Sequence, residues 1–121
     1  MTRVLVVDDS PTEVHVLRGM LEKHGYEVLV AETGEQGIKV AQESAPDVIL
    51  MDIVMPGVNG FQATRKLSKD PATSSIPIVM ISTKDQDTDR IWAKRQGALD
   101  YITKPVTEEE LHSKIKAALA G

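Results

Sequence analysis

The sequence predicts a single α/β domain with a parallel sheet covered by helices on both faces. Short apolar runs alternate with stretches of helical periodicity about five times along the chain. Each run is apolar almost throughout, as expected for strands of a parallel sheet that are buried on both sides. The 121 residues suffice for one sizeable core and are too few for two, so we expect one domain over residues 1–121.

The five predicted strands are short runs of mainly aliphatic residues. In chain order they are Val4–Val7, Val28–Ala31, Val48–Met51, Ile78–Ile81 and Tyr101–Ile102. A helical stretch follows each of them, and this strict alternation predicts that all five strands are parallel.

The predicted helices begin at residues that favour helix starts. Capping boxes open at Ser10, Thr33 and Thr107, each with an acidic or amide residue three positions later. Asn59 can cap the third helix. The fourth helix is predicted to run from about residue 88 to residue 96 and to end at the glycine that follows.

Composition excludes several classes of protein. The chain has no cysteine, which excludes disulfides, thiol chemistry and thiolate metal sites. No apolar stretch approaches the roughly 20 residues that span a bilayer, and the amino terminus lacks the features of a signal peptide. The net charge of −4, without a basic stripe, argues against nucleic acid as a direct partner. We therefore expect a cytoplasmic protein without membrane insertion. The last helix runs to the end of the sequence, so no attached output domain is expected.

Polar side chains follow four of the five predicted strands. They are Asp8 and Asp9 after the first strand, Asp52 after the third, Ser82 and Thr83 after the fourth, and Lys104 after the fifth. Ligands of open α/β sheets bind beyond the carboxyl ends of the strands. We therefore expect these side chains to converge at one edge of the sheet if their strands are neighbours.

The predicted cluster has the charge and the ligand type of a magnesium site. Two carboxylates about 4 Å apart repel by roughly 4 kcal/mol at an effective dielectric constant near 20, and a divalent cation relieves that repulsion. Hard oxygen ligands without cysteine favour Mg²⁺, for which Mn²⁺ can substitute, over zinc or copper. A carboxylate beside Mg²⁺ and a lysine is suited to phosphoryl transfer, and an aspartate can itself be the nucleophile.

The chain resembles the receiver domain of bacterial two-component response regulators over essentially all its length. The resemblance rests on the segments VLVVDDS, VILMDIVMPGVNG, IPIVMIST and GALDYITKP, which recur in the family's order and spacing. It implies a flavodoxin-like fold with the strand order 2-1-3-4-5. The segments GFQATRKLSKD, TKDQDTDR and AKRQGALDYITKPV are similar, more narrowly, to single-domain regulators of type IV pilus twitching motility.

The resemblance implies a role for each carboxylate of the cluster. Asp52 would accept a phosphoryl group from a histidine kinase, so the protein would catalyse only its own phosphorylation and dephosphorylation. Asp9 and Asp52 would bind Mg²⁺ directly, and Asp8 would do so mainly through water. Val54 would contribute its backbone carbonyl to the metal.

The resemblance also implies the residues that respond to phosphorylation. Ser82 would bond one phosphoryl oxygen and Lys104 would pair with another. The peptide bond before Pro105 would be cis, and Tyr101 would turn inward as Ser82 is drawn toward the phosphoryl group. The residues alone leave Thr83 open as the alternative to Ser82, because a shift of one residue exchanges the faces of a strand. They also leave open that Tyr101 simply packs at the sheet edge.

The resemblance implies a CheA-like histidine kinase or a phosphotransfer domain as the phosphoryl donor. The output would be a contact between a downstream protein and the face formed by the fourth helix, the fifth strand and the fifth helix. Arg90, Lys94 and Arg95 are candidates for that face, and the only tryptophan, Trp92, is either a partner anchor or a packing residue. Two alternatives stay open: a phosphate sink without a separate target, and a receiver of another pathway such as flagellar chemotaxis.

Two other classes of protein match the sequence less well. A flavin-binding flavodoxin needs a phosphate-binding loop after the first strand, and the acidic DDSPTE segment would repel a phosphate. A phosphatase of the haloacid dehalogenase type needs a second aspartate two residues after the nucleophile, where this chain has Val54.

Overall fold

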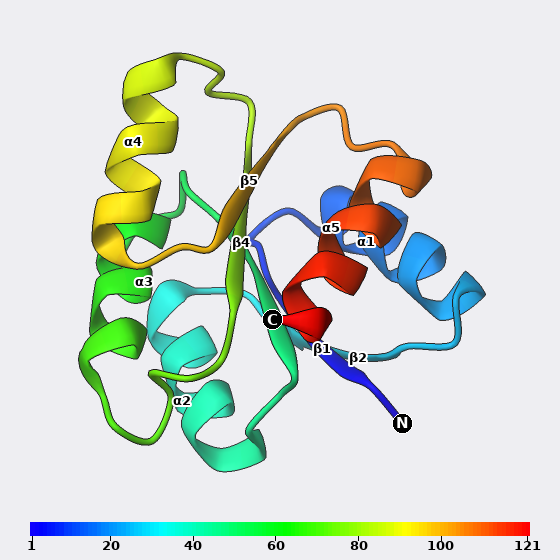
Figure 1. Ribbon diagram of the computed structural model, residues 1–121, viewed down its shortest axis with the longest axis horizontal. Helices are drawn as coiled ribbons and strands as arrows, with labels where there is room; N and C mark the ends of the chain where they lie inside the picture. Colours follow the sequence, from blue (N-terminus) through cyan, green and yellow to red (C-terminus); the bar gives the residue numbers. More distant parts are fainter.

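The chain alternates strictly between strand and helix in the computed structural model, which describes all of residues 1–121 (Figure 1). The elements are β1 (Arg3–Val7), α1 (Pro11–Lys23), β2 (Glu27–Ala31), α2 (Gly34–Ser44), β3 (Val48–Asp52), α3 (Gly60–Lys69), β4 (Ile78–Ser82), α4 (Asp87–Gln96), β5 (Asp100–Thr103) and α5 (Glu108–Ala120). All ten lie within a few residues of the predicted positions.

The five strands form one parallel sheet in the order β2-β1-β3-β4-β5, which confirms the predicted topology. The centre of the sheet is β3, and every residue of β3 and of its neighbour β4 is buried. Because all strands run in the same direction, their carboxyl ends lie at one edge.

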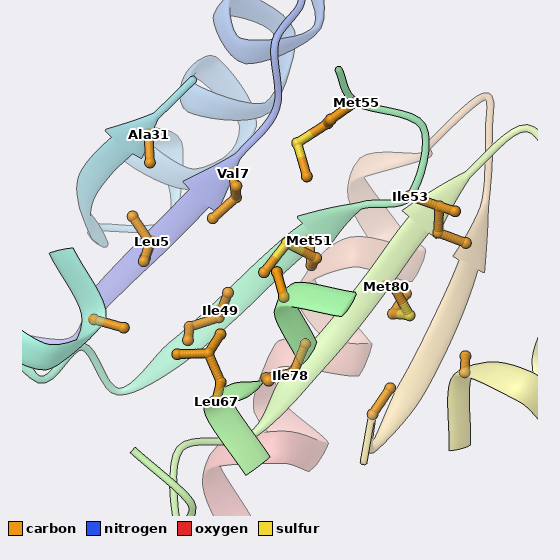
Figure 2. Close-up of a cluster of buried hydrophobic side chains, with 14 of the residues drawn as sticks. Leu5, Val7, Ala31, Ile49, Met51, Ile53, Met55, Leu67, Ile78 and Met80 are labelled. Atoms are coloured by element: carbon orange, nitrogen blue, oxygen red, sulfur yellow. The ribbon is translucent and has the colours of Figure 1, made fainter. Parts of the chain in front are cut away.

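The sheet separates two groups of core side chains. Leu5 and Val7 of β1 pack with side chains of α2, α3 and α4, whereas Val4 and Val6 of the same strand pack with those of α1 and α5. Figure 2 shows the first group, in which Leu67 of α3 lies among residues of the strands. A fully buried aliphatic side chain stabilises the fold by about 1.5–3 kcal/mol relative to its exposed state, so both layers are needed.

The predicted capping boxes are only half formed. Ser10, Thr33 and Thr107 each accept a hydrogen bond from the backbone N–H three residues later, at 3.3, 3.0 and 3.2 Å. The reciprocal bond fails at Ser10 because its own N–H donates to Asp8 Oδ1 at 2.9 Å. A complete box occurs instead at Asn59, whose side chain and backbone both bond to the third residue of α3.

Two details of α4 refine the sequence-based expectations. The helix begins one residue earlier than predicted, and the Asp89 carboxylate accepts a bond from the N–H of Gln86 at its start. The helix ends before Gly97, whose φ of 110° suits a residue without a side chain.

Trp92 is 48% exposed, so it does not pack in the core. No helix of the protein combines the length and the apolar character needed to cross a membrane.

Candidate functional site

Three carboxylates meet at the carboxyl edge of the sheet. Asp8 and Asp9 directly follow β1, and Asp52 is the last residue of the neighbouring strand β3. One carboxylate oxygen of each lies within 4.8 Å of the other two. Asp8 and Asp52 are buried, at 2% and 8% exposure, whereas Asp9 is exposed. The strand ends therefore bring together the three acidic residues that the sequence singled out.

Lys104 supplies the positive charge of the site. Its Nζ lies 3.5 Å from Asp52 Oδ1 and 3.6 Å from Asp8 Oδ2. A third carboxylate oxygen, Glu13 Oε2, lies 3.9 Å away. Burial alone would lower the pKa of Lys104, but the charges of these carboxylates outweigh it and hold the pKa above its usual value. Lys104 is therefore a permanently charged ammonium among acidic groups.

Glu13 is a member of this cluster that the sequence reasoning did not place there. It lies in the first turn of α1, and α1 begins at the same sheet edge as the aspartates. The sequence feature that could have placed Glu13 at the site is its position about one helical turn after Asp8 and Asp9. Sequence reasoning used this residue only as part of a helix cap.

The environment of Asp52 opposes its ionisation. Burial raises its pKa from 3.8 to about 6, and the neighbouring charge of Asp8 acts in the same direction. The ammonium of Lys104 offsets part of this increase. A divalent cation among the three carboxylates would offset the remainder, and an all-oxygen donor set is the type that Mg²⁺ prefers. The residues present therefore fit a magnesium ion.

The backbone after β3 is held close to Asp52. The N–H of Gly60, at the start of α3, donates to the carbonyl of Ile53 at 2.8 Å. A side-chain carbon at Gly60 would overlap the carbonyl oxygen of Asp52 and lie 2.8 Å from Ile53 Cα. Only glycine permits this approach, so the turn and the start of α3 fix the backbone that carries Asp52.

Two hydroxyl residues at the end of β4, Ser82 and Thr83, differ in burial. Ser82 is 1% exposed, whereas Thr83 is exposed. Ser82 Oγ accepts a hydrogen bond from the N–H of Lys84 at 3.2 Å. Asp52 lies opposite Ile81 in the pairing of β3 with β4, so Ser82 lies one residue beyond it. This arrangement favours Ser82 over Thr83 as the hydroxyl of the site.

The remaining predicted residues lie in β5 and in the segments that follow β3 and β5. Tyr101 is buried, at 7% exposure, and its hydroxyl donates to the carbonyl oxygen of Lys84 at 2.7 Å. The inward turn on phosphorylation that the resemblance implies stays a prediction. The peptide bond between Lys104 and Pro105 is cis. Val54 follows β3 at the same sheet edge, with a side chain that is 61% exposed.

Comparison with known proteins places the chain in a family. A family profile described as a response regulator receiver domain matches residues 4–116. The protein PilH of Pseudomonas aeruginosa is 62% identical over 121 residues, with 100% of both chains covered.

Solved structures agree with this match. The chemotaxis protein CheY4 of Vibrio cholerae has a TM-score of 0.93 at 30% identity, covering 98% of this chain and 99% of its own. The receiver domain of the sensor histidine kinase PA1611 of Pseudomonas aeruginosa, whose structure has a magnesium ion coordinated in the active site cleft, has a TM-score of 0.92 at 28% identity. There, 99% of this chain and 98% of that one are covered. With its fold, its acidic cluster and these matches, the chain belongs to the response regulator receiver domain family.

Proposed function

We propose that the protein is a response regulator of one domain, residues 1–121, that accepts a phosphoryl group on Asp52. The observation that carries this proposal is the meeting of three carboxylates, Asp8, Asp9 and Asp52, with the ammonium of Lys104 at 3.5 Å from Asp52. A single strand end with a carboxylate is common, whereas this combination has the parts that phosphoryl transfer requires.

We propose that Mg²⁺, or Mn²⁺ in its place, is held by Asp9 and Asp52 directly, by Asp8 through water and by the backbone carbonyl of Val54. When bound, the cation supplies positive charge that offsets the charges of the phosphoryl group and of the nucleophile. The raised pKa of Asp52 and the all-oxygen donor set support this assignment. The magnesium ion in the PA1611 receiver domain is consistent with it.

The transfer assigned to Asp52 is a displacement at phosphorus. A carboxylate oxygen of Asp52 attacks the phosphorus of a phosphohistidine, the P–N bond breaks, and the histidine nitrogen keeps the electron pair. The product is an acyl phosphate on Asp52 and a free histidine on the donor. The Lys104 ammonium pairs with one phosphoryl oxygen, and the Ser82 hydroxyl donates to another once the group has been transferred.

The signal then passes through Ser82 and Tyr101 to the face formed by α4, β5 and α5. Ser82 and Tyr101 are already connected, because both contact Lys84 in the loop between β4 and α4. A change in the position of the Ser82 hydroxyl therefore acts on the loop that holds Tyr101. We propose that a downstream protein reads this face.

We propose a CheA-like histidine kinase or a phosphotransfer domain as the donor, and twitching motility or a chemotaxis-like pathway in the cytoplasm as the setting. The 62% identity to PilH over the full length supports the first pathway, and the similarity to CheY4 supports the second. The output is a protein contact rather than turnover of a substrate.

Incubation with acetyl phosphate tests the proposal. Wild type is expected to form an acid-stable, base-labile phosphoprotein with Mg²⁺ and none with a chelator. Asp52→Ala is expected to lose the label, because the nucleophile is gone. Asp87→Ala removes an exposed aspartate of α4 and serves as the matched control with normal labelling.

Equal labelling of wild type and Asp52→Ala would contradict the assignment of Asp52. A pull-down with phosphorylated and unphosphorylated protein then separates the two kinds of output. Capture of a target by the phosphorylated form alone indicates an adaptor. Loss of the phosphoryl group from the kinase without any captured target indicates a phosphate sink.

A further inference from the structure

Two consecutive carbonyl groups in the loop between β4 and α4 are held by side chains of other elements. The Tyr101 hydroxyl of β5 donates to Lys84 O at 2.7 Å. The Nη1 atom of Arg90, in the first turns of α4, donates to Asp85 O at 2.8 Å. The N–H of Lys84 donates to Ser82 Oγ at 3.2 Å. The conformation of the loop beside Ser82 therefore depends on both side chains.

The Arg90 guanidinium joins this loop to β5. Its Nη2 atom donates to Thr103 Oγ1 at 2.9 Å, and its Cζ atom lies 5.3 Å from the centroid of the Tyr101 ring. The ring below it is 7% exposed. A planar guanidinium can donate in two directions while it contacts an aromatic ring, whereas an ammonium is a single compact donor that cannot make all three contacts.

We propose that Arg90 is a positioning residue that latches Tyr101 in its buried position and thereby fixes the loop that carries the Ser82 contact. Only the last step, the effect of this loop on a phosphorylated Asp52, rests on the proposed function. The contacts themselves do not depend on that function. Since both of its Nη atoms donate within the domain, Arg90 acts inside the α4–β5–α5 face rather than as a free cation on it.

The latch explains how α4 and the site are connected. If the loop moves when Ser82 changes partners, the contacts of Arg90 must change as well, and by linkage a loss of those contacts must change the equilibrium of the loop. The connection runs through three contiguous contacts: Arg90 with Tyr101, Tyr101 with Lys84, and Lys84 with Ser82.

Hydrogen exchange and NMR on the full unphosphorylated chain test the latch. In Arg90→Lys, which keeps the charge, we expect the amide of Lys84 to exchange about tenfold faster, as the loss of one hydrogen bond and of the ring contact predicts. Cross-relaxation between the Tyr101 ring and the loop is expected to weaken. Thr103→Val, which removes only the acceptor of Nη2, should shift both readouts in the same direction by less.

Arg65→Lys is the matched control, because it makes the same change at an exposed arginine of α3. It should leave the Lys84 amide and the Tyr101 ring as in wild type. Trp92, the only tryptophan, lies two residues from Arg90 and provides a fluorescence readout of α4 in each variant.

Unchanged exchange at Lys84 in Arg90→Lys, with Tyr101 still buried, would overturn the latch. So would a uniform increase in exchange over the whole chain, because that indicates a general loss of stability. These measurements need no phosphoryl transfer, so a failure of Asp52 to accept a phosphoryl group would leave their outcome unchanged. If Arg90→Lys does not fold, Thr103→Val still decides, because it is expected to shift both readouts in the same direction.

Discussion

At the scale of single residues, the buried carboxylate of Asp52 opposes folding when it is ionised. Its pKa is raised from 3.8 to about 6, so the native state binds more protons than the unfolded state between these two values. The stability associated with the protonated form is therefore lost as the pH rises through about 6.

This decrease of stability with rising pH gives a first prediction, for Asp52→Asn. With a chelator present, the substitution should increase the free energy of unfolding above pH 6 by at most about 3 kcal/mol, the equivalent of the pKa shift. The gain should shrink toward pH 4. Urea unfolding of both proteins between pH 4 and pH 8 measures it, and a difference that does not vary with pH would contradict the cause assigned here.

A second prediction separates the two hydroxyl groups at the end of β4. In Ser82→Ala, the acetyl phosphate concentration that gives half of the change in Trp92 emission should rise about tenfold. The reason is that a hydrogen bond to a charged group is lost. Thr83→Ala should respond as wild type does, because Thr83 is exposed. The reverse pattern would assign the role to Thr83.

The acidic residues of the site could be predicted from sequence, whereas several pairs of side chains could not. Asp8, Asp9 and Asp52 follow buried strands, and the strand ends alone bring them to one edge. His24 and His112, in contrast, stack with ring centroids 3.9 Å apart although they are far apart in the sequence. Such a pair depends on how α1 and α5 are rotated against each other, which helical periodicity does not specify.

At the scale of secondary-structure elements, the two glycines of α1 and α3 have opposite roles. The space beside Gly60 is filled by the backbone of Asp52 and Ile53, whereas nothing lies within 4 Å of a side-chain carbon at Gly19. Gly60 is therefore required by packing. Gly19 only weakens the helix that contains it.

A third prediction follows from this contrast. Gly60→Ala should destabilise the protein by about 3 kcal/mol, because the added carbon forces the backbone of Asp52 to move, and it should also reduce labelling by acetyl phosphate. Gly19→Ala should stabilise it by about 0.5–1 kcal/mol through helix propensity, with normal labelling. Urea unfolding measures both changes, and a loss of stability in Gly19→Ala would show that this reasoning is wrong.

Helix positions followed from sequence more closely than the details of their caps. Ser10, Thr33 and Thr107 start helices as their residue types predict. At Ser10 the glutamate of the expected box is free to approach Lys104 because Asp8 already accepts the N–H. The contact of Ser10 N–H with Asp8 thus takes the place of the contact with Glu13 that a capping box would have. The pattern of neighbouring residues does not indicate which of the two carboxylates accepts this N–H.

At the scale of the whole molecule, the sheet joins two core layers into one cooperative unit. Leu67 belongs to the layer under α2, α3 and α4, and Leu111 to the layer under α1 and α5. Both layers share the five strands, since alternate residues of each strand point to opposite faces. Loss of packing on either side therefore weakens the same sheet.

A fourth prediction tests this unity. Leu67→Ala and Leu111→Ala should each destabilise the protein by about 2–5 kcal/mol. In each variant, unfolding monitored by Trp92 fluorescence, which reports on α4, should coincide with unfolding monitored by far-ultraviolet circular dichroism. Two separate transitions in Leu111→Ala would indicate that the layers unfold independently.

The alternation of elements predicted a parallel sheet, but the order of its strands came from the resemblance to a family. Runs such as Val4–Val7 and Val48–Met51 are almost equally apolar, so hydrophobicity does not indicate which of them are neighbours. The positions of the aspartates gave an indirect clue, because a site requires β1 beside β3.

The parallel direction of all five strands leaves the opposite edge of the sheet free for chemical labelling. The connection from α3 to β4 lies at that edge, and Ser75 within it is exposed. A strand of five residues places it about 16 Å or more from the carboxylates. Because the chain has no cysteine, Ser75→Cys would create a unique thiol for a fluorophore. A dye attached there could follow kinase encounters in real time while the phosphoryl-accepting edge stays unobstructed.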